Sequence, residues 1–114
     1  METKLALHVS EKGVLSGFGY HDGRVRELHW REETLDIVFE AMDDLRTRLS
    51  FDGVRDCEIQ GTLAESIVGY IMVRRMDGSD EWEVSVEPIM GVGLKIRCVG
   101  FSAVRESSES VGGG

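Results

Sequence analysis

The most enzyme-like feature of the sequence is the pair His21-Asp22. An imidazole beside a carboxylate can act as a general base or contribute to a metal site. Neighbouring side chains on an extended chain point to opposite faces, however, and Asp22-Gly23 is an ordinary turn dipeptide. The sequence therefore favours a turn, with His21 in a local hydrogen bond or on the surface, and leaves catalysis by the pair as an alternative.

The sequence contains no spacing of ligand residues or glycines that is typical of a metal or phosphate site. His8, His21 and His29 could gather around a metal with Asp22 or a cysteine, but the short ligand spacings typical of metal sites do not occur. The glycines of residues 13–23 form no phosphate-binding fingerprint and precede no convincing helix. We therefore predict no catalytic residues, no metal and no cofactor.

The two cysteines, Cys57 and Cys98, each occupy an apolar position of an alternating pattern. Arg97 precedes Cys98, but alternation sends the two side chains to opposite faces, so the arginine cannot activate the thiol. We expect both cysteines to be buried and reduced, with a disulfide as the alternative.

Four aromatic residues are candidates for a ligand pocket. Aromatic walls with a few polar groups make good small-molecule sites when a sheet closes into a barrel. Packing in the core is the other role open to them. The four are Tyr20, Trp30, Tyr70 and Trp82.

Five carboxylates in two predicted loops are candidates for a binding surface. They lack basic partners in the local strand pairing, so together they could attract a basic protein. The alternative is that acidic loop tips merely keep the protein soluble. The five are Asp43, Asp44, Asp77, Asp80 and Glu81.

Apolar side chains recur at every second position over much of the chain, which is typical of β-strands. We therefore expect strands to position the candidate residues described above. Residues 35–41 and 45–51 predict a hairpin that places Glu40 opposite Arg46. Residues 82–86 and 94–98 predict a second pair, with Glu83 opposite Arg97 and Trp82 near Cys98. The outward charges of these pairs are therefore expected to be structural.

The remaining segments complete an all-β prediction. Strands are expected at residues 5–9, 24–31 and 66–75, with a β-bulge near Glu27, while residues 13–20 read as a loop. Thr62 and Glu65 could cap one short helical turn. The result is an antiparallel meander of about six or seven strands, closed as a barrel or folded as a sandwich. Residues 1–104 form one β domain, and residues 105–114 form a flexible Ser/Gly tail.

Charge narrows the choice of partner. The 114 residues include 21 acidic and 13 basic side chains, a formal net charge of −8. This charge opposes binding to nucleic acid or an anionic membrane, and no stretch is apolar enough for a membrane span. We expect a cytoplasmic protein whose partner has a basic surface; an exposed strand edge could also pair two copies.

Several short segments together resemble a loose group of small bacterial β proteins that begin with a His-Asp turn. The resemblance spans roughly residues 18 to 101 and departs from the group in the glycine-rich stretch before His21 and in the serine-rich tail. The group includes immunity-type proteins, which neutralise toxin domains. The resemblance implies a non-enzymatic protein-binding module and supplies no catalytic residues. The segments are residues 21–25, 35–39, 49–54 and 93–98.

Overall fold

The computed structural model describes residues 3–41, 45–61 and 66–106, and these residues form eleven strands and no helix. The all-β, antiparallel prediction is confirmed. In chain order the strands are β1 (Thr3–Leu5), β2 (His8–Val9), β3 (Leu15–Ser16), β4 (Arg24–Arg31), β5 (Thr34–Glu40), β6 (Arg46–Asp52), β7 (Asp56–Gln60), β8 (Ile67–Arg75), β9 (Trp82–Met90), β10 (Gly93–Cys98) and β11 (Gly100–Glu106).

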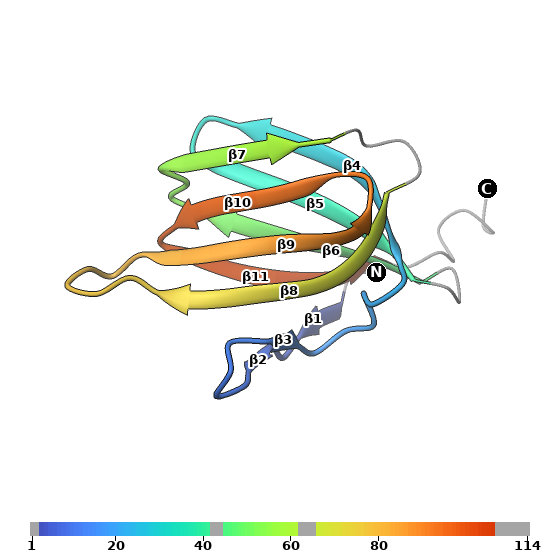
Figure 1. Ribbon diagram of the computed structural model, residues 1–114, viewed down its shortest axis with the longest axis horizontal. Coiled ribbons are helices and arrows are strands. Elements are labelled where there is room, and N and C mark those ends of the chain that lie inside the picture. Colours follow the sequence, from blue (N-terminus) through green and yellow to red (C-terminus); the bar gives the residue numbers. More distant parts are fainter. Residues whose placement is uncertain (1–2, 42–44, 62–65, 107–114) are drawn as a thin grey trace.

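Two sheets pack face to face as a sandwich (Figure 1). A five-stranded sheet has the order β1-β11-β6-β5-β4, a four-stranded sheet has the order β7-β10-β9-β8, and β2 and β3 form a separate hairpin. The chain changes sheet between β6 and β7 and again between β10 and β11, so hydrogen bonding does not continue around the molecule. The closed-barrel alternative is therefore wrong.

Alternation along the strands fills the space between the sheets. Phe39 and Phe51 from the five-stranded sheet and Ile71, Val84 and Ile96 from the four-stranded sheet are at most 1% exposed. Packing at this depth removes the large apolar side chains from water, which is the main favourable term in folding. The interior is thus occupied by core side chains.

The predicted registers are confirmed. Glu40 lies opposite Arg46 across β5 and β6, Glu83 lies opposite Arg97, and Trp82 lies opposite Cys98. The register of β4 against β5 shifts between Val25 and Glu27, where the bulge was expected. Side-chain alternation and cross-strand charge matching were sufficient to place these neighbours.

The strand count and several boundaries differ from the sequence prediction. The single strand expected at residues 5–9 is divided into β1, which joins the five-stranded sheet, and β2, which pairs with β3. Within residues 13–20, expected to be a loop, Leu15–Ser16 forms β3 and pairs with His8–Val9. Strand β11 contains Arg105 and Glu106, which were assigned to the tail, because it is held between β6 and β1. The possible helical turn at residues 62–65 lies outside the described residues.

The edges of the four-stranded sheet are treated differently. Along β8, the N–H of Val73 donates to the carbonyl of Gly13 at 2.7 Å, and Val14 bridges to Met72. Near the start of β8, Val68 exchanges hydrogen bonds with the turn before β4. Strand β7, at the other edge, pairs only with β10 among the described strands.

Candidate functional site

His21 and Asp22 lie in a turn that is fastened to β8. The N–H of Asp22 donates to the carbonyl of Val68 at 2.9 Å, and the N–H of Val68 donates to the carbonyl of Gly23 at 2.8 Å. His21 Nδ1 lies 2.7 Å from the carbonyl oxygen of Gly69, so Nδ1 carries the proton and donates. The turn interpretation is confirmed, and the imidazole serves as a tie between the turn and the strand.

The other histidines lie apart from this turn. His29 Nε2 is 2.8 Å from Glu27 Oε1 on β4, and His8 is exposed on β2. His21 Nε2 is 3.7 Å from Asp22 Oδ1, and its ring lies against Tyr70 with the centroids 5.0 Å apart. Over the described residues, no group of three metal-ligating side chains is close enough to hold an ion.

The two cysteines are free thiols in different surroundings. Cys98 is buried as predicted; burial, with a smaller contribution from Asp52, raises its pKa to about 11. Cys57 is only half-buried, because it lies on the edge strand β7. Burial, together with Asp56 and Glu58, raises the pKa of the Cys57 thiol. Both thiols are therefore less nucleophilic at neutral pH than an ordinary cysteine.

The four aromatic candidates do not meet around one cavity. Tyr20 is buried and donates its hydroxyl to the carbonyl of Leu15. Trp82 is half-buried against Phe101. Tyr70 and Trp30 are about half exposed, the first beside His21 and the second at the edge of the five-stranded sheet.

The carboxylates of the β8–β9 loop are largely paired. Asp80 lies 3.3 Å from Arg75, and Glu81 lies 3.2 Å from Arg55. The prediction that these acids lack basic partners is therefore wrong for both, because the folded chain brings in arginines that the local pairing did not consider. Asp77 is exposed and enters no ion pair among the described residues.

The other two predicted carboxylates, Asp43 and Asp44, lie outside the described residues. The residues that flank them, Ala41 and Leu45, are joined by a backbone hydrogen bond of 2.9 Å. Ala41 lies beside Gly23, at the end of the sandwich where β8 begins, whereas the β8–β9 loop follows the end of β8. The positions flanking the two predicted acidic loops are thus separated by a nine-residue strand, about 30 Å.

A different set of carboxylates gathers beside β7. The N–H of Val54 donates to the carbonyl of Glu33 at 2.8 Å, which joins the β4–β5 turn to the segment between β6 and β7. None of these carboxylates enters an ion pair with another described residue. We call them the acidic rim: Glu32, Glu33, Asp52, Asp56 and Glu58.

Apolar side chains lie next to this rim at the open side of the sandwich. On β7, Ile59 is opposite the buried Leu94 and therefore belongs to the inner face, yet it is 53% exposed. On β4, Trp30 is opposite the buried Leu35 and is 49% exposed. Figure 1 shows β4 and β7 along the same side of the molecule. We call the inner-facing residues of these two strands the apolar seam: Leu28, Trp30, Cys57 and Ile59.

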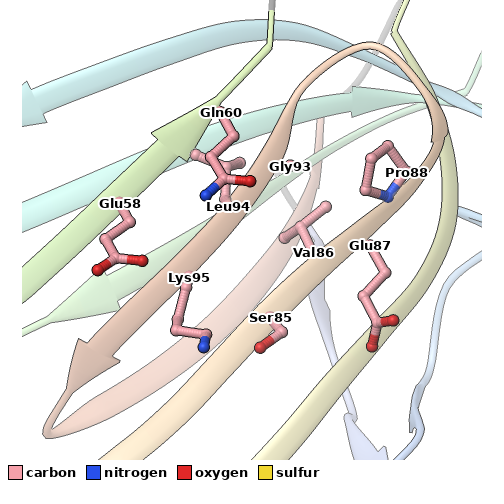
Figure 2. Close-up of a pocket in the computed structure, with 9 residues that line it drawn as sticks. All are labelled: Glu58, Gln60, Ser85, Val86, Glu87, Pro88, Gly93, Leu94 and Lys95. Atoms are coloured by element: carbon pink, nitrogen blue, oxygen red, sulfur yellow. The ribbon is translucent and has the colours of Figure 1, made fainter.

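The outer face of β7 borders a depression with both polar and apolar walls (Figure 2). Its volume is about 380 Å³, and its floor includes Gly93, where an added Cβ would lie 3.2 Å from Cδ of Pro88. Lys95 lies opposite Glu58 on one side and Ser85 on the other. The remaining polar walls are Gln60 and Glu87. Glu58 therefore belongs both to the rim and to a hollow that can receive a polar side chain.

Sequence reasoning missed the rim and the seam because their members come from separate parts of the chain. Glu33 is brought toward β7 by the hydrogen bond that its carbonyl accepts from Val54, just before that strand. One signal was available: residues 56–59 alternate acidic and apolar side chains, which is typical of a charged edge strand.

Comparison with known proteins adds no assignment: neither the protein-family models nor the curated proteins give a match to this chain. Among the described residues there is also no helix with the length and hydropathy needed to cross a membrane.

Proposed function

We propose that this chain is a non-enzymatic protein-binding module of the immunity type, which docks a basic toxin domain beside β7. The observation that carries the proposal is the acidic rim on and beside β7, along the same side of the molecule as exposed Trp30 and Ile59. Aromatic and apolar anchors surrounded by charged groups are typical of binding hot spots.

The charges favour a basic partner for this surface. The rim carboxylates form no ion pair with a described residue, although Lys95 and Arg97 of β10 lie opposite Glu58 and Asp56, and the whole chain carries a net charge of −8. Such a field accelerates encounter with a cationic protein and discourages polyanions. The exposed seam then supplies the apolar area that holds the complex after encounter.

The state of the reactive side chains supports a binding role over catalysis. His21 donates Nδ1–H to a backbone carbonyl, and burial raises the pKa of Cys98 to about 11. We also propose that the protein works in the cytoplasm, because free thiols persist in a reducing compartment.

The experiment captures binding proteins from cells that produce the chain and measures association with any basic protein recovered. The rim variant Asp56→Asn/Glu58→Gln is compared with the loop variant Asp77→Asn/Asp80→Asn, which removes the same amount of charge elsewhere. We expect stopped-flow association rates to fall several-fold in the rim variant, and the difference from wild type to shrink as salt rises. Equal rates for wild type and the rim variant at low salt would contradict the proposal.

A further inference from the structure

Among the described residues, the backbone edge of β7 that faces away from β10 has no strand partner, and it lies beside the surface just described. Strand β7 ends the four-stranded sheet, and its partner β10 occupies only one side of it. An edge strand offers a row of N–H and C=O groups that can pair with another extended chain. The opposite edge, β8, is already covered by Gly13, Val14 and the turn at His21.

We infer that β7 takes up an extended segment of the partner as a fifth strand of the sheet. The inference rests on the proposed function and specifies how the partner binds. Main-chain hydrogen bonds to residues 56–60 would supply affinity, while the side chains of β7 would determine which segment fits.

The alternation along β7 defines the chemistry of that segment. Asp56 and Glu58 lie on the outer face, whereas Cys57 and Ile59 lie on the inner face opposite the buried Ile96 and Leu94. An added strand places its own alternate side chains beside these two sets. The matching occupant therefore alternates basic side chains, facing the carboxylates, with apolar side chains that cover the seam and Trp30.

A second copy of the chain fits this edge less well. In a symmetric antiparallel pair of β7 strands, the outer faces of both copies lie on the same side of the joined sheet. The side chains of Asp56 and Glu58 from one copy then approach those of the other, and centring the pair on Glu58 sets two identical carboxylates directly opposite each other. Like charges in this arrangement are destabilising. Charge thus selects a basic segment over self-association.

The test uses the full chain and two synthetic peptides of the length of β7. One peptide alternates lysine with valine, and the other replaces each lysine with glutamate. We expect the basic peptide to slow amide hydrogen exchange across residues 56–60 and to protect the half-buried Cys57 from alkylation. The acidic peptide should do neither. Equal effects of the two peptides, or slowed exchange only outside β7, would overturn the inference.

Two matched variants test the same point with the basic peptide and with the captured partner. Ile59→Lys places a cation on the inner face of the edge, where it meets the incoming segment, and should weaken binding about tenfold or more. Ile89→Lys is the control, since Ile89 is similarly exposed at 58% but lies on β9. Unchanged affinity in Ile59→Lys would refute strand addition.

The outcomes for strand addition and for the proposed function are separable. If the rim variant slows association with the captured partner while Ile59→Lys binds as tightly as wild type, the choice of a basic partner is supported, whereas strand addition and the role of the apolar seam are both wrong. If neither variant affects association, both proposals fail. If both variants weaken binding and Ile89→Lys does not, both are supported.

Discussion

The two edge strands of the four-stranded sheet, β8 and β7, differ in how their backbone hydrogen-bonding groups are protected from pairing with other chains. At β8 the chain covers its own edge with backbone, through Gly13, Val14 and the turn fastened by His21. At β7 no described strand pairs with the outer backbone edge, and the strand carries Asp56 and Glu58. Charged side chains discourage unselective pairing at an edge, whereas a backbone cover prevents pairing altogether. The comparison supports the proposal that β7, unlike β8, pairs with a partner segment of opposite charge.

The largest expected effect is a difference in the free energy of unfolding between alanine variants of the two edge strands. Ile71 on β8 is fully buried, so Ile71→Ala should lower the free energy of unfolding by about 2–5 kcal/mol through lost burial and a cavity. Ile59→Ala on β7 should cost about 0.5 kcal/mol, because the side chain is already exposed. Urea denaturation measures both. Comparable losses in the two variants would show that the β7 edge is part of the packed core.

The next effect is the contribution of the two thiols to the pH dependence of stability. In the folded state the pKa of Cys98 is raised to about 11 from an ordinary value of 9.0, so the unfolded chain loses this proton first. Stability is therefore full below pH 9 and is lost as pH rises toward 11, by an amount on the order of 2 kcal/mol.

Thermal unfolding across this pH range measures the loss. The Cys98→Ala variant should lose stability less steeply than wild type over the same range. The Cys57→Ala variant should depart from wild type less than Cys98→Ala does, because Cys57 is only half-buried. Parallel pH profiles for wild type and Cys98→Ala would show that this thiol does not contribute.

A smaller effect tests the cover of β8. His21→Ala removes the hydrogen bond to the carbonyl of Gly69 and should cost about 1 kcal/mol. His29→Ala is the control, because its contact with Glu27 is on the surface and exposed pairs contribute little. We also expect amide exchange at Val68 to accelerate only in His21→Ala. Equal exchange rates in the two variants would contradict the claim that His21 holds the turn against β8.

The smallest effect concerns the acidic rim itself. The Asp56→Asn/Glu58→Gln variant should change the free energy of unfolding by at most about 0.5 kcal/mol, because exposed, unpaired charges contribute little to stability. Chemical denaturation alongside the binding measurements checks this. A large loss of stability would mean that the rim carboxylates hold the fold together.

Periodicity made the strands and their registers predictable, whereas the candidate site depends on long-range contacts. Glu40 faces Arg46 and Glu83 faces Arg97 because alternation and opposite charge act over short loops. No local pattern indicates that Glu81 reaches Arg55, or that Val54 joins Glu33 to β7. These contacts arise where the chain changes sheet, and a single sequence carries little signal for such crossings. The short strand β3 was missed for the same reason, since it is defined by its pairing with β2.

The pairing of β1 with β11 sets a condition on how the chain folds. Thr3 lies beside Arg105, so the first described strand finds its partner only after nearly all the described residues have been synthesised. Closing so long a loop lowers the entropy of the chain before any favourable contact has formed. Folds dominated by pairings between distant residues therefore reach the native state slowly. Residues 3–5 therefore stay unpaired until β11 has been synthesised, and the five-stranded sheet is completed late in folding. Until that step is complete, the edge of β11 that β1 covers in the folded protein is open to pairing with other chains, which favours aggregation.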